Sequence, residues 1–299
     1  MLDKEGLLKI SDRIVFDEPM SAHTSFKIGG NADAFVSAGS VDEIKELIAY
    51  CGKNGIPYML MGNGTNMLVS DKGIRGLVIQ VGSNMQRCEI DGETVFAEAG
   101  ILLSKLSRLI LGAELTGFET LSGIPGTLGG GIYMNAGAYG GEIKDAVYEV
   151  TYLSEDGEIK TIKNEDIGFS YRHSRFEEEK CIILSAVLNL KKGNADEIKA
   201  AMDDYNRRRA DKQPLSMPSA GSTFKRPEGY FAGKLIQDSG LMGYSIGGAQ
   251  ISEKHAGFVV NKGGAAAKDV LDLIEHVQKT VKDKFGVELE PEVRLIGEK

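Results

Sequence analysis

Cysteine is scarce in this sequence of 299 residues, and the few cysteines present are far apart. Cys51, Cys88 and Cys181 lie inside apolar segments, and their odd number and wide spacing favour neither a disulfide framework nor a zinc site. The four histidines are scattered in the same way, at His23, His173, His255 and His276. We therefore expect no metal site.

Long apolar runs and an excess of positive charge are also missing. No run of eighteen apolar residues occurs, and residues 1–20 lack the apolar core of a secretion signal, so we expect a cytoplasmic protein without a membrane partner. The formal net charge of -8 argues against a general nucleic-acid-binding surface. With 42% apolar and 26% charged residues, the composition is that of a soluble globular protein, and no obligatory protein partner is evident.

The dinucleotide fingerprint G-x-G-x-x-G is absent as well. Gly62 and Gly64 begin such a pattern, but Met67 stands where the third glycine should be, and no helix is predicted to follow. A Rossmann cofactor domain is therefore not expected.

Glycine, by contrast, is concentrated in one stretch. Residues 117–141, GFETLSGIPGTLGGGIYMNAGAYGG, hold nine glycines in twenty-five positions. Such a stretch fits tight turns as well as a backbone lying against an anion or a flat ligand. A second run of small residues, GNGTN at 62–66, follows an apolar segment and offers consecutive amides for an anion. Two such loops could hold the two halves of a dinucleotide cofactor.

The remaining pattern predicts an α+β fold. Ser40-x-x-Glu43 is a capping box that begins a helix ending at Gly55, and a regular apolar stripe over 270–285 predicts a helix closed by Gly286. Apolar residues at 287, 289, 293 and 295 alternate with charged ones, which predicts a strand with its charges on one face. Further helices are predicted at 102–112 and 196–212, hairpins at 88–97 and 147–163, and a strand at 181–190.

Five motifs in order give the sequence a family resemblance. GNGTN, SGIPGTLGG with NAGAYGG, YRHSRF, AGSTFKRP and ELEPEVRLIG resemble the UDP-N-acetylenolpyruvoylglucosamine reductase family, over residues 23–297. The resemblance implies an FAD-binding domain of the vanillyl-alcohol-oxidase (PCMH) type at 21–192, with α+β subdomains at about 21–82 and 83–192. It also implies a C-terminal α+β substrate-binding domain at 193–299, behind a lead-in at 1–20. The short spacing between YRHSRF and AGSTFKRP is similar to the shorter form of the family.

The resemblance also implies the cofactor and the reaction. NADPH as co-substrate reduces FAD, which then reduces UDP-N-acetylglucosamine enolpyruvate to UDP-N-acetylmuramate for peptidoglycan. The cofactor-binding residues implied by the two loops are Gly62, Asn63, Gly64, Thr65, Asn66, Ser122, Gly123, Pro125, Gly126, Gly129, Gly130 and Asn135.

Three matching positions would carry the chemistry. Arg172 would stabilise the enolate-like species, Ser222 would donate the proton, and Glu292 would assist at the enolate. Without the family, an arginine and a serine in such places are more simply a surface ion pair and a turn hydroxyl. Candidates for holding the sugar nucleotide are Tyr139, Arg208, Lys212, Lys225, Arg226 and Arg294.

Two rival functions share part of this pattern. A sugar-alcohol oxidase of the same fold shares the FAD loops but not the set of Arg172, Ser222 and Glu292, and its frequent covalent flavin usually needs a His or Cys near those loops. Neither 61–71 nor 117–141 contains one. A non-catalytic binding protein would have no reason to keep the three catalytic residues.

Overall fold

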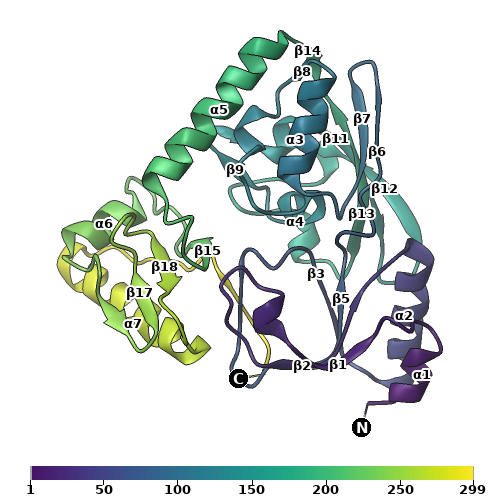
Figure 1. Ribbon diagram of the computed structural model, residues 1–299, viewed down its shortest axis with the longest axis horizontal. Helices are drawn as coiled ribbons and strands as arrows, with labels where there is room; N and C mark the ends of the chain where they lie inside the picture. The colour runs from purple at the N-terminus through teal and green to yellow at the C-terminus, as the bar shows by residue number, and fades with distance from the viewer. Residues whose placement is uncertain (1, 299) are drawn as a thin grey trace. The chain divides into compact units, whose positions relative to one another are not determined.

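The computed structural model describes residues 2–298 and divides into two compact units, which we describe separately (Figure 1). Unit 1 is formed by Met1–Ile14, Val36–Asn63 and Val78–Arg209. Unit 2 is formed by Val15–Phe35, Gly64–Leu77 and Ala210–Lys299. The compact units therefore divide the chain differently from the continuous domains predicted from the sequence, because two early segments join the C-terminal part.

The centre of unit 1 is a five-stranded antiparallel sheet in the order β12-β11-β13-β7-β6. Helix α4 packs on β13 and β7 (Figure 1). The two predicted hairpins are confirmed as β6–β7 and β11–β12, and the predicted strand at 181–190 is β13. The strands are β6 (Cys88–Asp91), β7 (Thr94–Glu98), β11 (Val147–Leu153), β12 (Ile159–Lys163) and β13 (Ile182–Asn189).

Smaller elements complete unit 1. Strand β3 (Tyr58–Met61) leads into the GNGTN loop, β8 (Leu115–Thr116) pairs with β14 (Lys191–Lys192), and β9 (Gly137–Ala138) pairs with β10 (Gly141–Glu142). The helices are α1 (Lys4–Leu8), α2 (Val41–Asn54), α3 (Leu103–Gly112), α4 (Leu128–Tyr133) and α5 (Ala195–Lys212), whose end belongs to unit 2. The 3₁₀ turns are η2 (Glu119–Leu121), η3 (Ile143–Asp145), η4 (Asn164–Asp166) and η5 (Arg175–Glu177).

The predicted helix ends are confirmed where the capping chemistry is local. The Ser40 hydroxyl accepts a hydrogen bond from the Glu43 amide at 3.1 Å, and Gly55 ends α2 in the left-handed conformation at φ 62°. Gly286 ends α7 (Ala267–Phe285) in the same way, at φ 70°. Since these caps involve residues only a few positions apart, the sequence alone reveals them.

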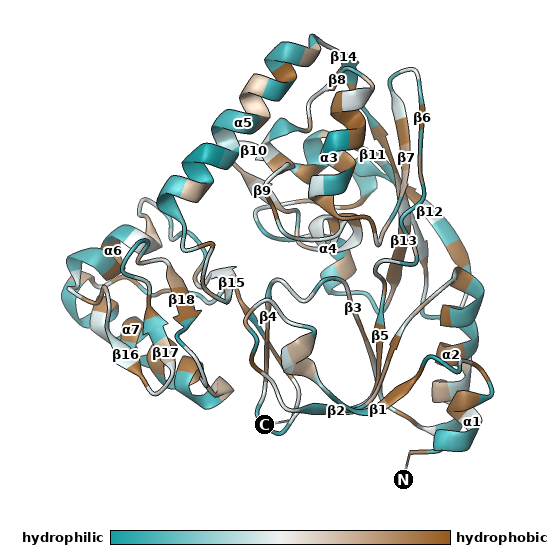
Figure 2. Cartoon of the chain, viewed as in Figure 1, coloured by the Kyte–Doolittle hydropathy of each residue, from teal (hydrophilic) through white to brown (hydrophobic). Residues whose placement is uncertain are grey.

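Unit 2 is built on a four-stranded antiparallel sheet in the order β15-β18-β17-β16. Helix α7 buries Val270, Leu273 and Val277 in a core shared with Phe224 and Leu68. Figure 2 shows β18 in the brown of apolar residues, whereas α5 is mostly teal. The elements are η1 (Met20–Ala22), β15 (Ser219–Ser222), α6 (Ala232–Asp238), β16 (Ser245–Ile246), β17 (Ala249–Ile251), β18 (Phe258–Asn261) and α7 (Ala267–Phe285).

Early segments of the chain are tied to the end of the chain within unit 2. Strand β4 (Met67–Val69) pairs in parallel with β19 (Arg294–Ile296), and the Asp71 carboxylate accepts hydrogen bonds from the first amides of α7, Ala267 at 2.7 Å and Lys268 at 3.0 Å. Strand β1 (Val15–Pro19) pairs with β2 (Asn31–Ser37). Strands β2 and β5 (Ile74–Gln80) each begin in unit 2 and end in unit 1.

One predicted element is wrong. Residues 287–295 do not form a continuous strand, because only Arg294–Ile296 is strand, and Leu295 is exposed although the alternation had placed it with buried Leu289 and Val293. Pro291 interrupts the segment, since it has no amide for a ladder hydrogen bond.

Among residues 2–298, no helix combines the length and the apolar character needed to cross a bilayer.

Candidate active site

Unit 2 brings three of the predicted site segments together. The Thr223 carbonyl, next to Ser222, accepts a hydrogen bond from the Glu292 amide at 2.8 Å. The Asn66 side chain donates to the Glu292 carbonyl at 3.2 Å, and the Asn66 carbonyl accepts from the Arg294 amide at 3.0 Å. The Ser222 loop, the EPEVR segment and the end of GNGTN therefore share one hydrogen-bonded backbone framework.

A β-bulge determines how Ser222 is presented. Between the pairs Ser219–Val260 and Ser222–Phe258 the first strand has one residue more than its partner, and Gly221 lies at φ 79°. A bulge bends the strand and re-aims the side chain that follows it. Next to Ser222, the Thr223 amide donates to the Gly257 carbonyl at 2.8 Å, and the Thr223 hydroxyl accepts from the Val259 amide at 3.0 Å. The position of Ser222 is thus fixed by its buried neighbour.

Unit 1 presents Arg172 on a strained turn. Ser170 and His173 exchange backbone hydrogen bonds of 3.1 and 3.2 Å, which leaves Tyr171 and Arg172 as the two central residues. Arg172 lies at φ 54°, in the left-handed region that glycine usually occupies at this position of a type II turn. Its Nη2 donates to the Gly137 carbonyl at 2.9 Å. An arginine thus occupies a position where the backbone favours glycine, and such backbone strain is typical of functional positions.

Tyr139 lies on a second strained turn of unit 1. It connects β9 to β10 at φ 54°, followed by Gly140 at φ 90°, as in a type I′ hairpin that normally takes Asn or Gly first. Its ring stacks on Tyr205 of α5, with ring centroids 4.9 Å apart. The hairpin therefore holds an exposed aromatic ring against α5 at an energetic cost, as a substrate clamp would require.

The strain at Arg172 leads to a testable difference in stability. Arg172→Gly and Arg172→Ala both remove the guanidinium, but only Ala has a Cβ that opposes a left-handed backbone. We expect Arg172→Gly to be more stable than Arg172→Ala by about 1 kcal/mol, with equal loss of activity. Urea unfolding of the two variants measures this difference. Equal stabilities would show that the turn relaxes when the arginine is removed.

The start of the GNGTN loop, residues 62–63, lies next to the SGIPGTLGG loop within unit 1. A Cβ built on Gly62 would lie 2.6 Å from the hydroxyl oxygen of Thr127, the N-cap residue of α4. Gly62 is therefore required because the SGIPGTLGG loop approaches it. Gly129 is explained in the same way, because its Cβ would lie 2.9 Å from that of Ala99. The absence of a Cβ at these two glycines therefore permits the close packing of the neighbouring segments.

The parts of the two loops that lie in unit 1 offer hydrogen-bond donors of the kind that an anionic cofactor requires. Within residues 2–298, the buried hydroxyl of Ser122 has no hydrogen-bond partner. In the same range, no acceptor receives the amides of Gly62, Asn63, Gly123 or Gly126. Buried polar groups normally find a partner, and a run of free amides is the donor set that a diphosphate accepts.

Arg209 is a further candidate residue that the sequence alone does not indicate. A Cβ built on Gly123 would lie 2.9 Å from its Nη1, so the guanidinium lies against the SGIPG loop. Burial lowers the pKa of Arg209, and the nearby Tyr139 opposes this shift. The only signal in the sequence is the basic run 207–209, in which Arg208 rather than Arg209 is the predicted ligand. Arg208 instead pairs with Asp204 at 2.6 Å on the surface of α5.

The structure gives Asn135 a different role from the predicted cofactor contact. Its side chain is fully buried, and the carboxamide binds Glu142, Ser170 and the amide of Lys144. It therefore has no exposed polar atom with which to bind a cofactor.

The predicted basic ligands of unit 2 lie in contacts with their own surroundings. Lys225 pairs with Glu290 at 2.5 Å, and the guanidinium of Arg226 lies 4.0 Å from the centre of the Phe231 ring. Exposed pairs of this kind are weak, so a diphosphate can compete for the cations. Lys212, at the end of α5, is exposed.

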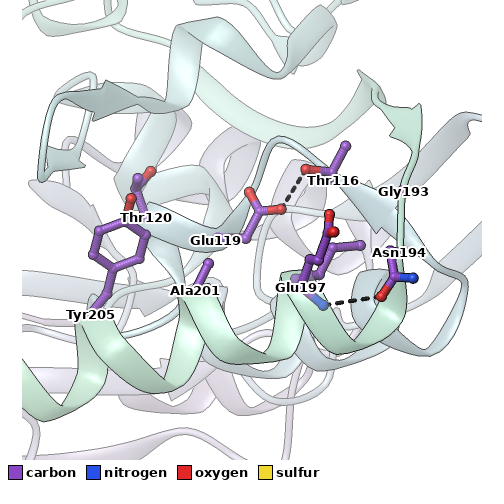
Figure 3. Close-up of a pocket in the computed structure, with 9 residues that line it drawn as sticks. Thr116, Glu119, Thr120, Gly193, Asn194, Glu197, Ala201 and Tyr205 are labelled. Carbon is purple, nitrogen blue, oxygen red and sulfur yellow. Dashed lines mark hydrogen bonds between the residues drawn. The ribbon is translucent and has the colours of Figure 1, made fainter.

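A cavity of 310 Å³ in unit 1 is not the predicted cofactor site (Figure 3). None of the predicted cofactor residues lines it, and Glu119 and Glu197 give it an acidic character that disfavours a diphosphate. The Glu119 carboxylate is held by the Thr116 hydroxyl at 2.6 Å and the Gly117 amide at 2.9 Å. Tyr205 lines one end of the cavity, and its ring also stacks on the ring of Tyr139.

Comparison with known families matches both parts of the chain. Residues 32–163 match the profile of an FAD binding domain, and residues 213–296 match the C-terminal domain of UDP-N-acetylenolpyruvoylglucosamine reductase. These matches lie inside the two domains predicted at 21–192 and 193–299.

Individual relatives extend over the whole chain. UDP-N-acetylenolpyruvoylglucosamine reductase from Caldanaerobacter subterraneus is 54% identical over 299 residues, covering 100% of this chain and 99% of that protein. The same enzyme from Clostridioides difficile is 51% identical, covering 95% and 94%. The crystal structure of the Thermus caldophilus enzyme shares 35% identity with a TM-score of 0.81, covering 94% of this chain and 97% of that one.

Proposed function

The chain belongs to the UDP-N-acetylenolpyruvoylglucosamine reductase family, and on that premise we propose that Arg172, Ser222 and Glu292 carry out its chemistry. It is an FAD-dependent oxidoreductase that uses NADPH to reduce UDP-N-acetylenolpyruvoylglucosamine in peptidoglycan synthesis. The observation that carries the assignment of residues is the backbone framework of unit 2, which joins the Ser222 loop to Glu292.

When bound, FAD accepts a hydride from NADPH and supplies it to the terminal carbon of the enolpyruvyl group. The free amides and the Ser122 hydroxyl support both loops as the binding residues. The residues proposed to hold FAD are Gly62, Asn63, Gly64, Thr65, Asn66, Ser122, Gly123, Pro125, Gly126, Gly129 and Gly130. We add Arg209, whose buried charge favours an anionic or electron-rich group against this loop.

Arg172 is proposed to stabilise the negative charge that the substrate develops. Addition of hydride to the terminal carbon leaves negative charge on the neighbouring carbon and on its carboxylate. A guanidinium binds a carboxylate through two parallel N–H donors and remains charged at any working pH. The strained turn fixes the donor before the charge develops, so that no reorganisation is needed during the reaction.

Ser222 and Glu292 are proposed to complete the reduction. Ser222 donates its hydroxyl proton to the carbanionic carbon, and this weak acid is effective because the enolate is strongly basic and the bulge holds the hydroxyl in place. Glu292 assists at the enolate, where it must be protonated or paired, since a second negative charge there would oppose the reaction.

The sugar nucleotide is proposed to bind through its diphosphate and its carboxylate. Lys225, Arg226, Lys212, Arg208 and Arg294 are the candidate cations, and Tyr139 is the candidate clamp. We further propose that residues 21–192 form the FAD-binding domain and residues 193–299 the substrate-binding domain. The acidic composition and the lack of long apolar runs favour a cytoplasmic enzyme without an obligatory protein partner.

We expect the flavin to be bound without a covalent bond. Neither cofactor loop contains a Cys or His, and burial raises the pKa of Cys51 and Cys181 to about 11 each, so these thiols stay protonated at neutral pH. Acid precipitation should leave all of the yellow colour in the supernatant. Flavin fluorescence that stays with the protein pellet would contradict this prediction.

The reaction itself is tested by its stoichiometry. In oxygen-free buffer, one UDP-N-acetylmuramate should form for each NADPH consumed, as measured by mass spectrometry and absorbance. NADPH oxidation that needs oxygen and yields peroxide without this product would identify an oxidase instead.

A further inference from the structure

Three residues of unit 1 with a positive backbone φ lie on segments that are connected by hydrogen bonds. Among the described residues, the non-glycine residues with positive φ include Asn135 at 45°, Tyr139 at 54° and Arg172 at 54°. Such a backbone costs most non-glycine residues about 1 kcal/mol or more and asparagine less, and clusters of such residues are typical of functional sites. Tyr139 and Arg172 already have proposed roles, whereas Asn135 contacts neither solvent nor the surface.

The carboxamide of Asn135 joins three segments. Its Nδ2 donates to Glu142 Oε2 at 3.0 Å and to the Ser170 carbonyl at 2.8 Å, and its Oδ1 accepts from the Lys144 amide at 3.3 Å. The Glu142 carboxylate and the Ser170 carbonyl can only accept, and the Lys144 amide can only donate. Only one orientation of the Asn135 carboxamide therefore satisfies all three partners. No other side chain of similar size offers two donors and one acceptor in this arrangement.

These bonds fix the turn that carries Arg172. Ser170 is the first residue of that turn, and Ser174, just beyond its end, donates its hydroxyl to the Tyr133 carbonyl at 2.6 Å. Both ends of the turn are therefore tied to the short segment 133–135. Ser174 and Asn135 are both fully buried, so water does not compete for either bond.

The guanidinium of Arg172 belongs to the same hydrogen-bond network. Arg172 Nη2 donates to the Gly137 carbonyl, and Gly137 pairs with Glu142 across the β9–β10 hairpin. Glu142 in turn accepts from Asn135. Asn135 thus holds the turn on one side and, through Glu142, the hairpin strand that contacts the guanidinium on the other.

We propose that Asn135 is the positioning residue of Arg172, because its carboxamide locks the Ser170–His173 turn to the β9–β10 hairpin and so fixes the guanidinium where the substrate carboxylate develops charge. This inference rests on the proposed role of Arg172. Loss of the carboxamide leaves Arg172 in the protein but frees its turn, and a misplaced donor loses most of its effect on a transition state.

Two half-reactions separate this role from a loss of folding. In Asn135→Ala, the rate constant for flavin reduction by NADPH should stay within about twofold, while the anaerobic reoxidation by the enolpyruvyl sugar nucleotide should fall about 10- to 100-fold, as for other residues that orient a functional side chain. Asn164→Ala is the matched control, since Asn164 also donates twice to carbonyls in unit 1, of Lys144 at 2.7 Å and Val147 at 2.6 Å. The control should keep both rates.

A double-mutant cycle tests whether Asn135 acts through Arg172. The variant Asn135→Ala/Arg172→Ala should reoxidise no more slowly than Arg172→Ala alone. Additive losses would overturn the positioning role while leaving the role of Arg172 intact. A full reoxidation rate in Arg172→Ala would overturn the role of Arg172, and the inference with it.

A second variant keeps the test decisive if Asn135→Ala folds poorly. Asn135→Gly removes the same carboxamide, but glycine adopts φ 45° without strain and offsets part of the lost stability. It should show the same selective slowing of reoxidation. Equal slowing of both half-reactions in Asn135→Gly would contradict the proposal.

Discussion

Replacing Ser222 by alanine should leave flavin reduction by NADPH nearly unchanged and slow the reduction of the enolpyruvyl sugar nucleotide by about 10²- to 10⁴-fold. The magnitude is that of losing a positioned proton donor. The variant should fold normally, because the Ser222 side chain is exposed. The buried contacts of this segment are made by Thr223. Anaerobic stopped-flow measurement of the two flavin transitions gives both rate constants.

Ser219→Ala is the matched control for this variant. Ser219 lies in the same strand on the other side of the bulge, where it pairs with Val260, and its loss should affect neither rate. If Ser222→Ala slows both half-reactions equally, the hydroxyl is not the proton donor and serves binding or folding instead.

Replacing Arg172 by alanine should slow substrate reduction by about 10²- to 10³-fold, with flavin reduction by NADPH unchanged. Loss of one donor to a developing oxyanion has this size. In the proposed role the guanidinium also pairs with the substrate carboxylate before reaction, so the apparent KM should rise as well. Arg172→Lys should recover only part of the rate, since an ammonium lacks the planar pair of donors.

Arg175→Ala serves as the control for Arg172. Arg175 lies in the same YRHSRF segment, and its guanidinium pairs with Glu179, with Nε to Oε1 at 2.8 Å. Its removal should cost at most some stability and leave reoxidation intact. Equal kinetic losses in both variants would mean that the segment, rather than the charge at position 172, matters for the reaction.

The sequence revealed those features whose causes are local. The N-cap at Ser40, the glycine that ends α7 and the two hairpins of the large sheet depend on residues close together in the chain, and all are confirmed. The second bond of the predicted capping box differs, since the Glu43 carboxylate accepts from the Gly39 amide rather than from that of Ser40. The family resemblance is confirmed by relatives that match the whole chain. It could be recognised from the sequence because five short motifs in order do not require knowledge of the fold between them.

The division into compact units could not be predicted, because it depends on pairings between distant segments. Strand β4 follows GNGTN closely but pairs with β19 at the other end of the chain, and Asp71 caps α7. Neither partner leaves a local pattern. For the same reason the strand expected at 287–295 is wrong, since Pro291 and the neighbouring Thr223 and Asn66 backbones determine its path.

Within the site, the sequence indicated residue types better than their roles. Asn135 belongs to a cofactor-like motif, yet its partners Glu142 and Ser170 lie on segments that only the fold brings together. Arg209 is one of three consecutive arginines, and only its burial against Gly123 distinguishes it. The positive φ of Arg172 is likewise invisible in a sequence that shows an ordinary arginine.

The most direct test of the account is an anaerobic titration of the purified protein. NADPH should bleach the visible absorbance of the flavin, and adding UDP-N-acetylglucosamine enolpyruvate without oxygen should restore it rapidly and completely. Flavin that stays bleached until air is admitted would contradict the account, as would a protein that neither contains nor takes up FAD.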